Sequence, residues 1–97
     1  MKRTEAVRLL KQHEAELRNL GVVRLYLFGS TARDEAGAGS DVDLFFDHPR
    51  GKLSLYGLMD IKELTRAILS QPADIMTRSS LHPMLRAEIE ASAIRVF

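Results

Sequence analysis

The stretch from Val22 to Asp47 constrains the fold of this chain more than any other part of the sequence. Two segments rich in β-branched and aromatic residues, Val22–Phe28 and Asp41–Asp47, are typical of strands, and a glycine-serine pair with a loop of small residues separates them. The second segment carries Asp41 and Asp43 one residue apart. Because two like charges at this spacing repel and are costly to desolvate without a positive group between them, the segment predicts a cation as the missing partner.

Helical patterns surround these two strands. Apolar residues spaced three to four apart predict helices over Thr4–Leu20 and Leu53–Gln71; Gly21 and Pro72 follow them as end signals, and Ser54 is expected to cap the second helix. The remaining predicted elements are a short helix over 30–36, a strand over 73–77, a helix over 81–92 with Pro83 in its first turn, and a final edge strand or tail over 93–97. This order predicts one α+β domain over residues 1–97, a small mixed β-sheet with helices packed on it.

Composition argues against several classes of function. The 97 residues are 45% apolar and 28% charged, which is ordinary for a globular domain, and no apolar run has the length of a membrane span. Fourteen basic and 13 acidic residues give a net charge of +1, without the basic stripe of a strong non-specific nucleic-acid binder. Because the chain has no cysteine and its first residues lack a secretory apolar segment, we expect a cytoplasmic protein.

Asp41 and Asp43 have the spacing of a metal clamp. Side chains alternate along a strand, so both carboxylates should share one face with their Cα atoms roughly 7 Å apart, while Val42 and Leu44 point into a core on the other face. Two parallel carboxylates supply half of an oxygen cage for Mg²⁺, which phosphate oxygens and water would complete. The alternative is a polar edge strand with both aspartates in solvent, the commoner meaning of an isolated Asp-x-Asp.

The Gly29-Ser30 pair is a candidate phosphate cradle. Gly29 has no Cβ, so a phosphate can approach the backbone, and Ser30 and the amides of the helix that follows favour an anion, although such a pair seen alone is usually a simple turn. Ten residues separate Ser30 from Asp41, and the two signals together indicate a cradle beside a metal clamp. Arg33, three residues after Ser30, is expected either to reach the same phosphate or to be a solvated arginine. Ser40 is expected to cap or orient the loop before Asp41.

These residues resemble the motif of the DNA polymerase beta-like nucleotidyltransferases, which has an apolar residue, Gly-Ser, a gap of about ten residues, and Asp-x-Asp between apolar residues. The segments FGSTARDEAGAGSDVDL, residues 28–44, and ADIMTRSSLHPMLRAEI, residues 73–89, are similar more narrowly to the minimal nucleotidyltransferase (MNT) branch, whose members are antitoxins paired with HEPN-domain toxins. The resemblance covers nearly the whole chain and implies the polymerase beta-like fold. One departure is Asp34, where the branch commonly has glycine; an acidic group there predicts weaker phosphate affinity.

The resemblance also implies a set of site residues. The superfamily uses a third carboxylate on an adjacent strand, and Asp74 is the matching position. The implied catalytic and metal-binding residues are Asp41, Asp43 and Asp74, and the implied nucleotide-binding residues are Gly29, Ser30, Arg33 and Ser40. Two Mg²⁺ ions are expected, one holding the triphosphate and the other lowering the pKa of an acceptor hydroxyl whose proton Asp74 would accept.

The implied activity is transfer of AMP from ATP to a hydroxyl, in this branch a tyrosine of the cognate HEPN toxin, by an antitoxin that forms a hetero-oligomer with the toxin. Since the motif and its sheet use the whole chain, we expect another protein to bring the acceptor, and Leu55, Tyr56 and Met59 are expected to expose an apolar patch for it. A non-catalytic antitoxin that occludes its toxin is the alternative. A nucleotidyltransferase acting on nucleic-acid ends ranks last, because the six aromatic residues lie mostly in apolar strands.

Overall fold

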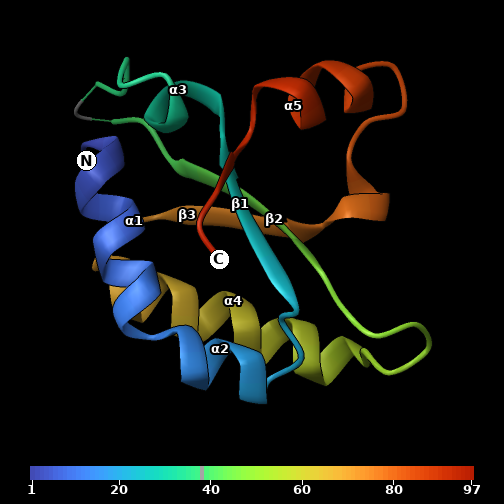
Figure 1. Cartoon of the computed structure of the whole chain (residues 1–97). Helices are drawn as coiled ribbons and strands as arrows, with labels where there is room; N and C mark the ends of the chain where they lie inside the picture. Colours follow the sequence, from blue (N-terminus) through green and yellow to red (C-terminus); the bar gives the residue numbers. More distant parts are fainter. Residues whose placement is uncertain (38) are drawn as a thin grey trace.

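The computed structural model describes residues 1–37 and 39–97, and in this part of the chain four strands form one sheet in the order β3-β2-β1-β4 (Figure 1). The strands are β1 (Arg24–Phe28), β2 (Val42–Asp47), β3 (Ala73–Thr77) and β4 (Ile94–Arg95). β1 is antiparallel to both β2 and β4, whereas β2 and β3 are parallel. The sheet is therefore mixed, as predicted, and the last segment is an edge strand rather than a free tail.

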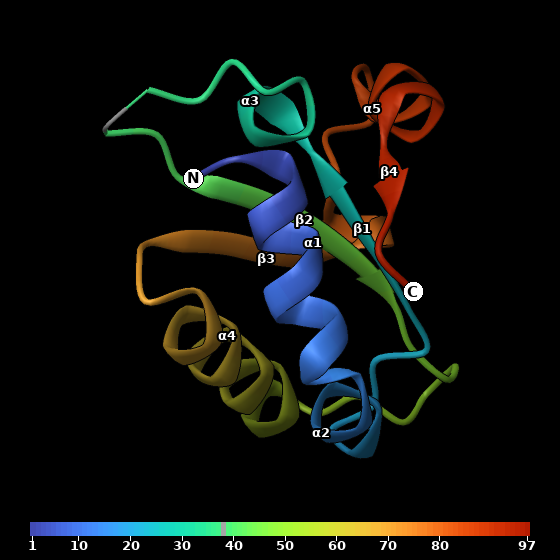
Figure 2. The same cartoon turned by 60° about the vertical axis from the view of Figure 1, so that its left-hand side comes forward.

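One face of the sheet is covered by α1 (Arg3–Gln12), α2 (Glu14–Asn19) and α4 (Leu55–Leu69) (Figures 1 and 2). The main core lies between these helices and the inward-facing residues of the strands. Its buried members include Leu10, Leu17, Leu25, Leu27, Val42, Leu44, Phe46, Ile61 and Ile75. Alternate strand residues, such as Val42 and Leu44, enter this core, so the residues between them must face the opposite side of the sheet.

That opposite side carries a smaller aromatic cluster. Tyr26 stacks on the buried Phe45 with ring centroids 4.8 Å apart, and the Arg78 guanidinium lies over both rings at 4.9 and 5.0 Å. Arg78 begins the short 3₁₀ helix η1 (Arg78–Ser80) and also donates hydrogen bonds to Asp47. These contacts anchor the segment after β3 to the sheet and leave the other end of the same face to the carboxylates described below.

Three helix predictions were wrong in part, those over Thr4–Leu20, 30–36 and 81–92. The predicted helix over Thr4–Leu20 is broken at His13, which separates α1 from α2. His13 leaves helical dihedral angles (φ −111°, ψ 20°), and its amide donates to the Leu10 carbonyl three residues back, which interrupts the α-helical series. No glycine or proline marks this break, so the sequence pattern gave no signal for it.

The predicted helix over 81–92 is shorter, because α5 (Arg86–Ser92) begins only at Arg86. Pro83 lies in a turn before it rather than in its first helical turn. The Leu85 amide donates to the His82 carbonyl at 2.9 Å, which puts Pro83 at the second position of a β-turn, where its fixed φ is favourable.

The prediction for α4 is confirmed at its start, where the Gly57 amide donates to the Ser54 hydroxyl at 3.0 Å. The helix ends with Ser70 in the left-handed conformation, just before Pro72 and β3. Over the residues that the structure describes, none of the helices combines the length and the apolar content that crossing a membrane requires.

Candidate active site

The site begins where strand register brings Gly29 against Asp43. In the antiparallel pair of β1 and β2, Phe28 is the partner of Asp43, so the residue after Phe28 lies beside the Asp43 carboxylate. Gly29 has φ +75°, and a Cβ placed on it would overlap Asp43 Oδ2 and lie 3.3 Å from Asp43 Cγ. The backbone conformation favours glycine here, and any larger residue would have to rotate the Asp43 carboxylate away.

The parallel pair of β2 and β3 brings the third carboxylate to the same place. Asp74 is the register partner of Asp43, and Asp41 precedes Asp43 by two residues on the same side of the strand. Val42 and Leu44 are fully buried on the opposite side. The three aspartates that the sequence singled out therefore lie together on one face of the sheet, with Asp43 half-buried between the exposed Asp41 and Asp74.

The three aspartates carry more negative charge than the nearby Arg33 offsets. Burial raises the pKa of Asp43 above its ordinary value, and the negative charges of Asp74 and Asp41 raise it further. The Arg33 guanidinium acts in the opposite direction but does not offset the other effects. A bound cation would remove this penalty, so the cluster favours a positively charged ligand.

The donor set fits Mg²⁺. Among the described residues, no three Asp, Glu, His or Cys side chains form a ready-made metal cage. Asp41, Asp43 and Asp74 nevertheless supply only carboxylate oxygens, the ligands that a hard divalent cation prefers, and Mg²⁺ usually takes one or two protein carboxylates and completes its shell with phosphate oxygens and water. An incomplete set of protein ligands is what such a site requires.

The segment after Gly29 is a single helical turn. Helix α3 (Gly29–Ala32) is shorter than the predicted helix over 30–36, and within it the Arg33 amide donates to the Gly29 carbonyl at 3.2 Å. The Arg33 side chain is exposed and pairs with Glu35 at 3.0 Å, so in this structure it is a solvated arginine near the carboxylates. Exposed pairs of this kind contribute about 0–1 kcal/mol, so a phosphate can displace Glu35 at little cost.

Ser40 closes the turn that leads into β2. Its hydroxyl accepts a hydrogen bond from the Gly37 amide at 3.2 Å, and its own amide donates to the Gly37 carbonyl at the same distance. The structure thus bears out the expectation that Ser40 orients the loop before Asp41.

Asp34 has a backbone conformation that glycine would also adopt, and its carboxylate makes a structural contact. Its φ is +57°, a left-handed conformation that glycine adopts freely and aspartate tolerates. Asp34 Oδ1 accepts a hydrogen bond from the Arg3 amide at 2.8 Å, and Arg3 Nη1 donates to the Ala32 carbonyl at 3.2 Å. The Asp34 carboxylate is therefore engaged by the first turn of α1, which connects α1 to the end of α3.

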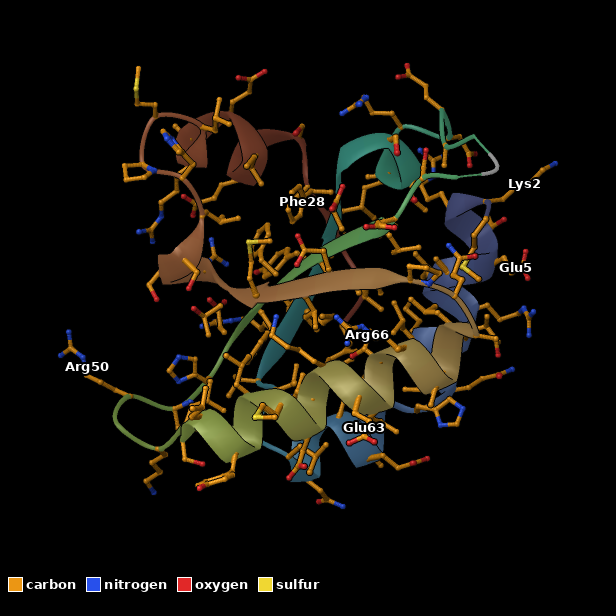
Figure 3. All side chains as sticks on the ribbon, turned by 180° about the vertical axis from the view of Figure 1, so that it is seen from behind. Lys2, Glu5, Phe28, Arg50, Glu63 and Arg66 are labelled. Carbon is orange, nitrogen blue, oxygen red and sulfur yellow. The ribbon has the colours of Figure 1, made fainter. Side chains whose placement is uncertain are left out.

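A cleft of about 550 Å³ opens on the β3 side of the carboxylates. Asp41 and Asp74 line it together with Arg66 and Gln71 near the end of α4. Figure 3 shows Arg66 on the side of α4 that faces β3, where its Nε donates a long, 3.4 Å hydrogen bond to the Ala73 carbonyl. Sequence reasoning missed Arg66 because only the packing of α4 along β3 brings it to the site.

A second hollow, about 580 Å³, lies between α1 and β4 and is lined by Val7, Ile94 and the basic side chains of α1. No carboxylate lines it, and it is formed by other elements than those that carry the three aspartates. The chemistry therefore favours the cleft beside Asp41 and Asp74 as the candidate active site.

Comparison with known proteins identifies the family of this chain. The sequence pattern of the nucleotidyltransferase domain matches residues 10–96. A Methanocaldococcus jannaschii protein, whose name assigns it provisionally to the protein adenylyltransferases, is 37% identical over 76 residues, covering 78% of this chain and 81% of that protein. The protein adenylyltransferase MntA of Thermococcus cleftensis is 36% identical over 74 residues, covering 75% of this chain and 74% of its own.

Solved structures agree on the fold. A structure provisionally assigned as a minimal nucleotidyltransferase superposes with a TM-score of 0.81 at 30% identity and covers 97% of this chain and 95% of that one. A toxin-antitoxin complex with AMP-PNP gives a TM-score of 0.71 at 17% identity, covering 90% and 72% of the two chains. An MNT antitoxin in complex with a tri-AMPylated HEPN toxin of Shewanella oneidensis gives 0.65 at 16% identity, covering 94% and 71%. Together with the Gly29-Ser30 turn beside the aspartates on one sheet face, these matches establish that the chain belongs to the nucleotidyltransferase-domain family, among the minimal nucleotidyltransferases.

Proposed function

We propose that this chain is a Mg²⁺-dependent protein adenylyltransferase that transfers AMP from ATP to a tyrosine hydroxyl of a HEPN-domain toxin and thereby acts as its antitoxin. The relatives named protein adenylyltransferases support AMP as the transferred group, and the neighbour with AMP-PNP supports ATP as its donor. The neighbour with a tri-AMPylated toxin supports the kind of acceptor. We further propose that residues 1–97 act as one minimal nucleotidyltransferase domain in the cytoplasm, where ATP and Mg²⁺ are available.

The single observation that carries this proposal is the packing of Gly29 against Asp43, with Asp74 opposite on β3. The backbone at Gly29, which a phosphate can approach, therefore lies directly beside the clustered carboxylates. A Cβ at position 29 would overlap Asp43 Oδ2, so the arrangement depends on the glycine. Neither a simple turn nor a polar edge strand requires this closeness.

Three carboxylates have assigned roles in the proposal. Asp41, Asp43 and Asp74 would hold two Mg²⁺ ions, which would neutralise phosphate charge and lower the pKa of the acceptor hydroxyl. Asp74, on the edge strand and exposed toward the cleft, accepts the proton of that hydroxyl. The hydroxyl oxygen forms a bond to the α-phosphorus of ATP, the bond from that phosphorus to the bridging oxygen breaks, and pyrophosphate leaves.

The nucleotide is held on the β1 side of the carboxylates. Gly29 allows the phosphates to approach the backbone of α3, and Ser30 adds a hydroxyl hydrogen bond. Arg33 exchanges its exposed pairing with Glu35 for a phosphate oxygen. Ser40 holds the loop that delivers Asp41 and lies beside the bound nucleotide.

The toxin would dock on the exposed start of α4. Leu55, Tyr56 and Met59 are 70%, 80% and 56% exposed, which is unusual for three large apolar side chains so close together on one helix. Burying them against a partner would be favourable.

Intact mass spectrometry tests the proposal. This chain, ATP and Mg²⁺ are incubated with a candidate HEPN-domain toxin from the same genome, and the toxin mass should rise by one or more AMP units. Asp74→Asn should abolish the increase while the complex still forms, because it removes an exposed proton acceptor and metal ligand but keeps the shape of the side chain. Glu63→Gln, an exposed carboxylate on α4, is the matched control and should transfer normally. A toxin that is inhibited but unmodified would move the function to occlusion, and an unchanged rate in Asp74→Asn would refute the role given to Asp74.

A further inference from the structure

We infer that Arg66 is an acceptor-side phosphate-binding residue, which holds the phosphate of an AMP already attached to the acceptor while its ribose hydroxyl receives the next AMP. The inference rests on the proposed function and adds one residue to it; repeated transfer itself already appears in the tri-AMPylated toxin of the neighbouring structure. In this view the cleft beside β3 accepts either the unmodified side chain or the nucleotide that the first transfer leaves on it.

The charges that line the cleft include two carboxylates and one guanidinium. Asp41 and Asp74 line one part of it and would repel an anionic acceptor, whereas an unmodified tyrosine is neutral and needs no cation. Arg66 is the cation among the residues that line the cleft. A cation beside these two carboxylates would favour an acceptor that carries negative charge.

The Arg66 side chain makes few contacts of its own. In the described part of the chain no ion pair joins Arg66 to a carboxylate, and the only hydrogen bond of its side chain is the 3.4 Å contact from Nε to the Ala73 carbonyl. The two Nη groups thus remain for a ligand. A guanidinium presents these donors as a planar fork that matches two phosphate oxygens.

The size of the cleft agrees with this class of acceptor. Its volume of about 550 Å³ lies within the range of about 300–1,000 Å³ that holds drug-sized ligands. A hydroxyl-bearing side chain alone would leave much of this space empty, whereas a side chain with a nucleotide attached would fill more of it. The cleft opens at the exposed edge strand, so the lengthening product can extend into solvent.

The chemistry is that of the first transfer with another hydroxyl. A ribose hydroxyl oxygen of the attached AMP forms a bond to the α-phosphorus of a new ATP, the bond to the bridging oxygen breaks, and pyrophosphate leaves. The hydroxyl proton passes to Asp74. Arg66 holds the phosphate of the attached AMP and takes no part in bond making.

Lys62 provides a matched control for Arg66. It lies one turn earlier on α4, and its Nζ donates to the Ile75 carbonyl of β3 at 2.9 Å. Both side chains thus support the same edge strand, but only Arg66 lines the cleft. A loss caused by weakened support of β3 would therefore appear in Lys62→Gln as well.

The first measurement is calorimetric binding with the donor site saturated by AMP-PNP and Mg²⁺. AMP and adenosine, which share the base and ribose and differ in the phosphate, are titrated as probes. Arg66→Gln should weaken AMP binding about tenfold or more and leave adenosine within about twofold, and Lys62→Gln should change neither. Equal AMP binding in Arg66→Gln and the parent, or equal loss for both probes, would overturn the inference.

The second measurement counts AMP units on the toxin by mass. The parent and Lys62→Gln should give products with two or more units, whereas in Arg66→Gln the rate of the second addition relative to the first should fall about tenfold or more, so that the single-unit product accumulates. A parent that stops at one unit, or an Arg66→Gln variant with the parental distribution, would refute the inference. A parent that adds none would refute the proposed function instead, and the calorimetry would still decide whether Arg66 binds phosphate.

Discussion

Replacing Gly29 by alanine should damage the site more than it damages the fold. Gly29 has φ +75°, and an added Cβ would overlap Asp43 Oδ2. Gly51 offers a control at nearly the same φ, +71°, with nothing within 4 Å of an added Cβ. Both variants therefore place alanine at a positive φ, and they differ in the contact with Asp43.

The structure sets the expected magnitudes. An alanine in the left-handed region costs about 1–2 kcal/mol, which is the whole effect expected for Gly51→Ala. In Gly29→Ala the atom overlapped is the end of a side chain that can rotate, since Asp43 Cγ and Cβ lie 3.3 and 3.4 Å away and need shift only slightly. Rotating the carboxylate off its preferred angle adds about 0.5–1.5 kcal/mol. The nucleotide affinity should suffer more, because the displaced carboxylate is a proposed metal ligand.

Urea unfolding and calorimetric titration of ATP with Mg²⁺ measure the two effects on the same proteins. Gly29→Ala should be less stable than Gly51→Ala by about 0.5–1.5 kcal/mol and should bind ATP at least about tenfold more weakly, while Gly51→Ala binds normally. In an Asp43→Ala background the two glycine substitutions should cost the same, since the overlap is gone. Equal stability and equal ATP affinity of the two single variants would refute the reasoning.

Three other outcomes concern carboxylates. With divalent ions chelated, Asp43→Asn should raise the melting temperature at pH 7, because the raised pKa of Asp43 means that folding disfavours its ionised form. Below pH 3.8 the Asp43 carboxyl is protonated in both the folded and the unfolded state, so the gain should disappear there. A gain that persisted below this pH would contradict this cause. Asp47→Asn should cost about 2 kcal/mol at pH 7, since Arg78 donates to Asp47 at 2.7 and 2.9 Å. Those hydrogen bonds lower the pKa of Asp47, so its contribution should be lost as the pH falls below 3.8, and a difference from the parent unchanged at pH 2 would count against it. Asp34→Ala should cost about 1–2 kcal/mol by losing the acceptor for the Arg3 amide, whereas Asp34→Asn should stay within about 0.5 kcal/mol in urea unfolding.

Much of the site could be predicted from the sequence because its chemistry is local. The Gly29-Ser30 pair, the ten-residue gap and the Asp41-x-Asp43 alternation each depend on a strand, a turn and the two-residue period of side chains. The strand over Ala73–Thr77 was predicted with its observed bounds, since Pro72 and a short β-branched run mark it. Residue type and spacing are sufficient for features of this kind.

Two helix boundaries could not be predicted, because no local residue fixed them. At His13 a chain without glycine or proline changes direction where α1 ends and α2 begins. At Pro83 the sequence allowed either a first helical turn or a β-turn, and the hydrogen bond from Leu85 to His82 selected the β-turn. Such choices depend on how a segment packs, which a propensity does not contain.

By itself the sequence singled out the residues that are proposed to carry the chemistry: a glycine expected to lie close to a phosphate and two aspartates expected to share one face. Only the tertiary structure decided what surrounds them. Strand register put Asp74 beside Asp43, and the packing of α4 along β3 brought Arg66 to the cleft from a helix that looks unremarkable in the sequence. The physical reason is that spacing along the chain fixes a side chain's direction within its own element, whereas the distance between two elements is set by the core buried between them.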